Sequence, residues 1–144
     1  MSDIDLDRKL ERLKSVKSAF ILEAQSLNEQ GLTAFANPLL RRAAELECEL
    51  AGLFRLKGDS RNAAVSLFSA GSCLVQARQY RSAVEILETV TDRFPEAQDL
   101  IAQCGDHDDL PVVAETPALQ TLIELLVKKG LITEDDWMDA FAAR

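Results

Sequence analysis

The chain has 144 residues, the length of one domain, and its 47% hydrophobic content is enough for a substantial core. Six glycines and four prolines are too few for a fold made of strands and turns, so the composition predicts an all-α protein. Residues 1–104 have 15 acidic and 13 basic side chains and residues 105–144 have 9 and 3, which excludes nucleic acid as a partner because its phosphates would be repelled.

Apolar residues recur at steps of three or four along most of the chain, which predicts a series of helices. The first covers about 5–29, and we interpret the basic residues on it as a solvated face. The second is predicted to begin at Asn37-Pro38, since Asn caps helices and Pro suits their first position, and to end near Lys57. The third covers about 61–77, capped by Asp59 or Ser60, and the fourth covers about 80–93.

The C-terminal part of the chain is predicted to form a separate unit. Residues 96–103 form a short helix, and 104–113 form a loop because Gly, Pro and three Asp disfavour regular structure. A helical hairpin follows, with one helix between Pro117 and Gly130 and another opening at Thr133. We therefore expect a helical domain at 1–103, an acidic linker at 104–115 and a hairpin at 116–144, which must dock on the main body or on another chain.

Small and large residues alternate at fixed points along the third and fourth helices. Gly71 and Ala83 lack bulk, so the two helices are predicted to approach closely while leucines fill the space around them. Pro95 ends the fourth helix and sets the direction of the next. The structural positions of this pattern are Leu67, Gly71, Leu74, Ala83, Leu87 and Pro95.

This pattern resembles the tetratricopeptide repeat, closely in residues 64–97 and loosely in 38–63. The resemblance implies a right-handed array of antiparallel helical hairpins. The chain departs from the family at Arg78, where the family favours Gly. A second register, in which helix 61–77 is the second helix of a pair, fits equally well, and a plain four-helix bundle is the alternative fold.

If helix 61–77 is the first helix of a repeat, the resemblance implies that one of its faces lines a binding groove. Phe68 and Val75 would then be apolar anchors for an extended or helical peptide. The alternative is that this uncharged helix is simply core. The groove-facing positions are Val65, Phe68, Ser72, Val75 and Gln76.

Residues 119–137 resemble a second family, the short C-terminal oligomerisation hairpin called SHOCT. The match is carried by Gly130, Ile132, Thr133, Glu134, Asp135 and Trp137. The resemblance implies self-association, and the alternative is a helix pair that caps the end of the array. The candidate contact residues are Leu122, Leu126, Ile132, Trp137 and Phe141.

No motif indicates catalysis, a cofactor or a nucleotide. Cys104 and His107 form one Cys-x-x-His pair without the second pair that a zinc site needs, so no metal is expected. We expect no signal peptide at the charged N-terminus and no membrane span, and three widely spaced cysteines suit the reduced thiols of the cytoplasm.

The sequence thus favours an acidic, cytoplasmic interaction module that binds another protein or peptide and is not an enzyme. Its tail would form a homo-oligomer or cap the array. A secretion-type tetratricopeptide chaperone for a hydrophobic client is the second hypothesis. A metal sensor or enzyme that uses Cys104 and His107 is the third.

Overall fold

The computed structural model describes residues 2–110, 121, 124–130 and 133. These residues form helices and no strand, which confirms the predicted all-α class. Residues 124–128 are also helical. The named elements are α1 (Asp3–Glu29), α2 (Thr33–Leu56), α3 (Ser60–Gln76), α4 (Tyr80–Leu87), the 3₁₀ helix η1 (Glu88–Val90) and α5 (Glu96–Cys104).

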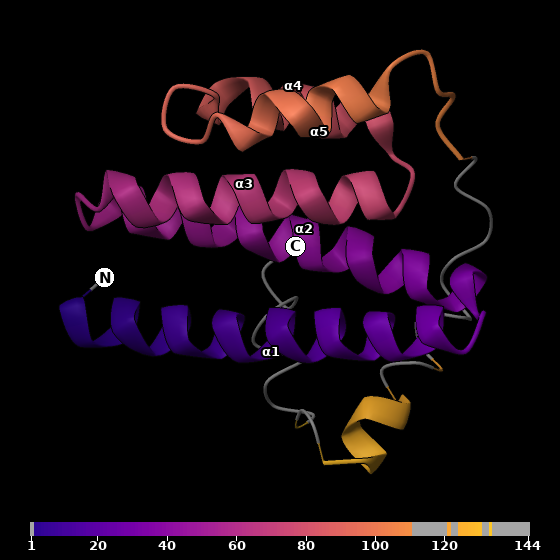
Figure 1. Ribbon diagram of the computed structural model, residues 1–144. Helices are drawn as coiled ribbons and strands as arrows, with labels where there is room; N and C mark the ends of the chain where they lie inside the picture. Colours follow the sequence, from indigo (N-terminus) through magenta and orange to yellow (C-terminus); the bar gives the residue numbers. More distant parts are fainter. Residues whose placement is uncertain (1, 111–120, 122–123, 131–132, 134–144) are drawn as a thin grey trace.

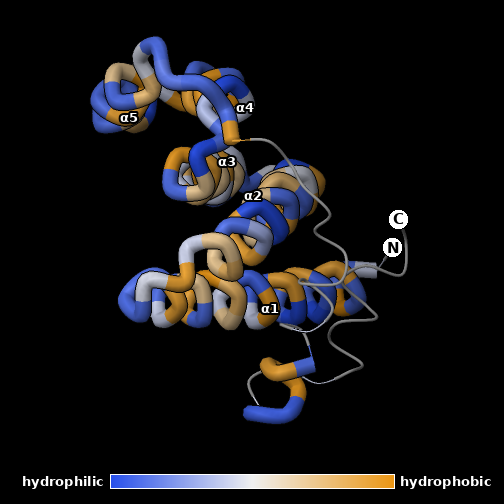
Figure 2. The backbone as a smooth tube through the Cα atoms, turned by 90° about the vertical axis from the view of Figure 1, so that its right-hand side faces the viewer, coloured by the Kyte–Doolittle hydropathy of each residue, from blue (hydrophilic) through white to orange (hydrophobic). Residues whose placement is uncertain are grey.

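The helices stack in chain order, and each packs mainly on the one before it and the one after it. Successive helices run in opposite directions, from α1 at the bottom of Figure 1 to α4 and α5 at the top. Seen from the side in Figure 2, α4 lies above α3, with α5 on one side of this pair and α2 on the other. In the described part of the chain, no helix is both long enough and apolar enough to cross a membrane.

The three tight turns between α1 and α4 have the same hydrogen bond. In each, the amide of the third residue after the helix donates to a carbonyl in the last turn, which is the Schellman geometry. Gly31 and Gly58 supply the required positive φ in the first two turns, at 78° and 75°, and Arg78 adopts 59° in the third. The donors are the amides of Leu32, Asp59 and Gln79, and the acceptors are the carbonyls of Leu27, Phe54 and Leu74, each at 2.8 Å.

The predicted start of the second helix was wrong. Helix α2 begins at Thr33, and Pro38 lies inside it rather than at its first position. Pro38 has no N–H to donate to the preceding turn, which normally disfavours a helix interior. The helix continues through Pro38 because nearby residues before and after it, Ala36 and Leu39, are fully buried. Asn37 is 8% exposed and does not cap the helix.

The fourth helix is shorter than predicted, because α4 ends at Leu87 and η1 follows it. The hydroxyl of Thr89 donates to the carbonyl of Ile86 at 2.6 Å, and that of Thr91 to the carbonyl of Glu88 at 3.4 Å. Such side-chain bonds compete with the helical pattern. The short helix predicted at 96–103 is confirmed as α5, and Asp59 caps α3 as predicted, since its side chain accepts from the amide of Asn62.

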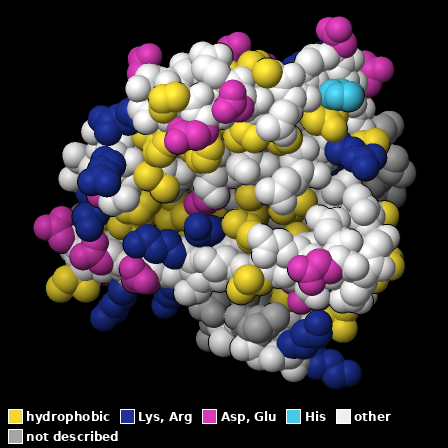
Figure 3. All heavy atoms as spheres, viewed as in Figure 1, with side chains coloured by type: hydrophobic (Ala, Val, Ile, Leu, Met, Phe, Trp, Pro, Cys, Tyr) yellow, Lys and Arg dark blue, Asp and Glu magenta, His cyan; other side chains and the backbone are white. Residues whose placement is uncertain are grey.

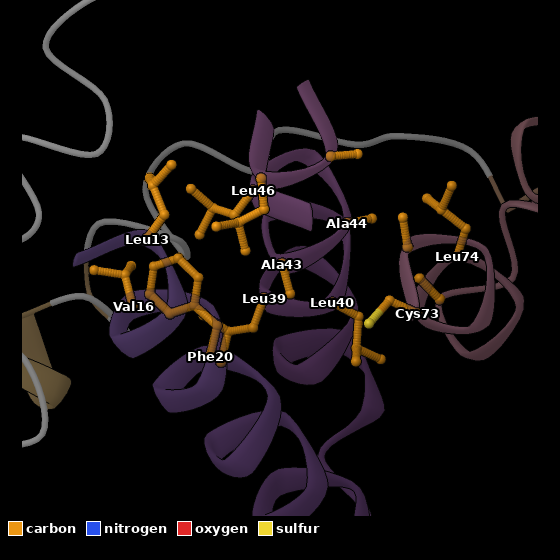
Figure 4. Packing of buried hydrophobic residues seen from close by; sticks show 14 of the residues in the cluster. Leu13, Val16, Phe20, Leu39, Leu40, Ala43, Ala44, Leu46, Cys73 and Leu74 are labelled. Carbon is orange, nitrogen blue, oxygen red and sulfur yellow. The ribbon is translucent and has the colours of Figure 1, made fainter. Parts of the chain in front are cut away.

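Buried residues of all these helices form one core. Figure 4 shows part of it, where Leu13, Val16 and Phe20 of α1 face α2, and Cys73 and Leu74 lie on α3. Helix α3 is therefore sandwiched between α2 and α4. This position explains why the repeat pattern fits the sequence in two registers, since α3 packs closely on both neighbours.

The close approach predicted at Gly71 is present. A Cβ placed on Gly71 would lie 2.5 Å from both Cγ and Cδ2 of Leu87. Ala83 and Leu87 are both 0% exposed, so the Leu87 side chain has no free space to move into. Helices α3 and α4 therefore nest through a small residue, as the sequence pattern indicates.

Candidate protein-binding surface

The five groove-facing positions predicted on helix 61–77 lie along one side of α3, which we call the α3 strip. Val65 is 45% exposed and Gln76 is also exposed, whereas Ser72 and Val75 are half-buried. Phe68 is half-buried as well, and its ring stacks on Phe94 with centroids 5.0 Å apart. The structure thus leaves four of these positions accessible and uses Phe68 partly to hold the segment that leads into α5.

The local sequence explains the strip. Small residues on the opposite sides of α3, including Ala70 and Gly71, are buried against its neighbours, which leaves the strip facing outward. Residues 62–77 include no charged side chain. An outward helix face usually has charged residues, so an uncharged face that is only partly buried is a candidate contact surface.

A second feature, which the sequence did not predict, is a buried charge between α1, α2 and α3. Glu47 is 1% exposed and lies on the buried face of α2, four residues after Ala43. Its Oε2 is 3.5 Å from Nζ of Lys17. Burial raises the pKa of Glu47, and the hydrogen bond from Ser69 and the charge of Lys17 oppose that increase.

This buried carboxylate affects a neighbouring thiol. Burial, together with the charge of Glu47, raises the pKa of Cys73 to about 12, so this thiol is not a nucleophile at neutral pH. The sequence contains a signal for the burial of Glu47. Apolar residues recur at helical spacing on either side of it, which places Glu47 on the core face of the helix.

Part of the basic surface of α1 is also structural. Lys14 Nζ lies 5.5 Å from the centre of the Phe54 ring, and Lys17 pairs with Glu47, so these two lysines join α1 to α2. Asp7 of α1 adds a pair with Lys57, the residue that follows α2, at 2.6 Å. On the face shown in Figure 3, Lys and Arg side chains border the hollow between α1 and the helices above it, where hydrophobic side chains are visible.

The loop after α5 folds back onto the start of α4. The Asp109 carboxylate accepts from the amide of Arg81 at 3.0 Å, and the Gln79 side chain donates to the carbonyl of Leu110 at 3.0 Å. The His107 ring lies 5.4 Å from the ring of Tyr80. Between the loop and α4 there is a pocket of 590 Å³.

The proposed metal pair has structural contacts in this loop. Cys104 is buried, its Sγ donates to the carbonyl of Leu100 at 3.3 Å, and burial raises its pKa. Residues 2–110 and the other described positions contain no group of three or more metal-binding side chains. The arrangement therefore serves to fix the loop, with Asp109 as the N-terminal cap of α4.

Of the five candidate contact residues in the C-terminal hairpin, the structure describes Leu126. It is 0% exposed, and nearby Lys129 pairs with Glu23 of α1 at 3.2 Å. The C-terminal part of the chain thus contacts the main body in at least one place. The other four candidates, and most of the segments predicted at 111–123 and 131–144, lie outside the described residues.

Comparison with known proteins identifies no relative: no family model, no curated protein and no solved structure matches this chain. The class that the structure defines is an all-α stack of antiparallel helices. The functional argument therefore starts from the surface of this stack.

Proposed function

We propose that this protein is a protein–protein interaction module whose α3 strip binds a peptide or helix of a partner. The observation that carries the proposal is the uncharged, outward side of α3, with Val65 45% exposed at the N-terminal end of the strip. An apolar side chain in such a place offers an anchor, and the neutral surroundings allow a partner to exclude water without stripping charges.

A tetratricopeptide-like array is the arrangement that we propose for the stack. Three equivalent turns and the close approach of Gly71 to Leu87 support it. In arrays of this kind, stacking produces an extended surface for partners. We place α3 as the first helix of a pair with α4, since this register puts the α3 strip on that surface.

We assign the C-terminal part of the chain to self-association or to capping of the array. The buried Leu126 and the pair of Lys129 with Glu23 support a docking role for this part of the chain. The cytoplasm remains the expected location, and neither an enzymatic activity nor a metal is part of the proposal.

The proposal is tested by a charge placed on the α3 strip. The Val65→Glu variant should lose a partner that the wild-type chain captures from its source cells, because the partner would have to bury an unpaired carboxylate. A loss of tenfold or more in recovered partner is expected, measured by quantitative mass spectrometry. Leu56→Glu is the matched control, because Leu56 is an exposed leucine, 74% accessible, at the end of α2.

The control variant should recover the partner as the wild type does. Equal recovery by the Val65→Glu variant would exclude the α3 strip as the binding surface. Circular dichroism of both variants verifies that the helices are intact, which is expected because both side chains point to solvent.

A further inference from the structure

The α3 strip lies beside a hollow whose other side is formed by α1. Helices α1 and α3 both pack on α2, and Figure 3 shows the hollow between α1 and the helices above it. Val65, Ser69 and Ser72 follow one another at steps of four and three residues, so they lie on one face of α3. Ser69 contacts the carboxylate of Glu47, and so does Lys17 of α1, which shows how the two helices are aligned.

Two lysines of α1 lie along the strip. Lys17 is level with Ser69, because both contact Glu47. Helices α1 and α3 run in the same direction in Figure 1, so Lys14, one turn before Lys17, is level with the turn of α3 that includes Val65. The side chains of Lys14 and Lys17 are 44% and 24% exposed, so a partner at the strip can reach both of them.

These lysines are only partly neutralised by the chain itself. Lys14 pairs with Glu11 at 3.3 Å, but the Glu11 side chain is 74% exposed, and ion pairs so open to water contribute little. Nζ of Lys17 lies 3.5 Å from Oε2 of Glu47, whereas a strong charged hydrogen bond is about 2.7–2.9 Å long. Both ammonium groups can therefore accept an anion from outside.

A partner segment seated on the α3 strip would extend over the hollow and cover part of these ammonium groups. Covering a cation without an anion costs free energy, whereas a carboxylate placed against it compensates for the lost water. On α3 itself, residues 62–77 include no charged side chain that could do so. The charge beside the strip is therefore positive, and its complement is an anionic segment.

We propose that the α3 strip binds an acidic segment of a partner protein, which places an apolar side chain on Val65 and a carboxylate against Lys17. The inference rests on the proposed function, since it specifies the partner of the same surface. A second carboxylate close to the apolar side chain would meet Lys14. A basic segment would face two like charges, so the surface selects its partner by charge as well as by apolar contact.

The probe is a library of random linear peptides displayed on phage and selected on the wild-type chain. Peptides that also bind the Val65→Gln variant are discarded, because this substitution removes the apolar anchor without adding a charge. The remaining peptides should be enriched in Asp and Glu near apolar residues. One of them is then synthesised, together with analogues in which Asn or Gln replaces one acidic residue at a time.

Binding of these peptides is measured by fluorescence anisotropy. Wild type should bind the acidic peptide about fivefold more tightly than at least one analogue, and the Lys17→Gln variant should lose this preference. Arg8→Gln is the matched control, because it removes the same charge from the same helix. Nine residues, about two and a half turns, separate Arg8 from Lys17, so the two lie on opposite sides of α1. The control should retain the preference.

A second variant guards against a fold defect, since Lys17 also pairs with the buried Glu47. Lys14→Gln changes a more exposed side chain and should likewise reduce the preference for the acidic peptide, while circular dichroism verifies that each variant is folded. Peptides that require Val65 but show no acidic preference would overturn this inference and leave the proposed function standing. So would a preference that both lysine variants retain, or one that Arg8→Gln reduces equally. If no peptide distinguished wild type from Val65→Gln, both would be excluded.

Discussion

Gly71 marks a close approach of α3 and α4. The space that a Cβ would need is taken by Leu87, whose Cγ is only 2.5 Å from that position. Cγ lies near the backbone of its own residue, and Leu87 is 0% exposed, so the conflict is not relieved by a simple side-chain rotation. A single hydrogen at residue 71 thus sets the distance between α3 and α4.

The Gly71→Ala variant is expected to be destabilised by about 1–3 kcal/mol, because the added methyl group overpacks the contact with Leu87. Thermal and urea unfolding followed by circular dichroism measure the change. Gly52→Ala is the matched control, since Gly52 lies inside α2 and nothing lies within 4 Å of its added Cβ. The control should be more stable by about 0.5–1 kcal/mol, because alanine is the better helix former. Similar effects of both substitutions would contradict the nesting.

At the scale of the element, local signals predicted the ends of α1 and α2 well, but the start of α2 and the end of α4 badly. Gly31 and Gly58 end α1 and α2 because a positive φ favours glycine. Asn37-Pro38 has equally strong local chemistry for a start, yet α2 begins at Thr33. The difference is burial, which depends on where α1 lies and is not written in the local sequence.

In the candidate site too, some features follow from the local sequence and others depend on how distant segments pack. The tetratricopeptide resemblance implied that the α3 strip lies on one helix face, and the structure leaves Val65 and Gln76 exposed there. The stacking of Phe68 on Phe94 could not be predicted, since the two lie 26 residues apart and meet only after η1 turns the chain. Glu47 was missed because a charged residue was assumed to be solvated.

Helix α4 depends on a cap from outside its own segment. Gln79, the residue before it, has no side-chain cap bond, and Asp109 accepts from the amide of Arg81 instead. The Asp109→Ala variant should therefore lose about 1 kcal/mol of stability, as at other helix caps. Chemical denaturation gives this value, and Asp108→Ala, which removes an adjacent exposed carboxylate, is the control. An equal loss in both variants would mean that Asp109 acts only through its charge.

At the scale of the whole molecule, each helix after α1 lies on the helix before it, and a single buried cluster extends from α1 to α5 and Leu126. The buried Glu47 of α2 contacts Lys17 of α1 and Ser69 of α3, so this side chain joins three of the helices. Because its pKa is raised, it also makes the stability of the stack depend on pH.

That link has a definite sign. Burial raises the pKa of Glu47 above its ordinary value, while Lys17 from α1 and Ser69 from α3 partly oppose this effect. The folded state thus holds a proton that the unfolded state releases, and the stabilisation present below about pH 4 is lost as pH rises through the folded-state pKa.

The Glu47→Gln variant cannot titrate at this position. The stability of the wild type relative to this variant should therefore decrease as pH rises above about 4, measured by urea unfolding at each pH. Glu45→Gln, which removes an exposed carboxylate of α2, should retain the pH dependence of the wild type. If the wild type and the Glu47→Gln variant instead changed in parallel, the pKa of Glu47 would be the same in the folded and unfolded states, which would contradict the effect of its burial.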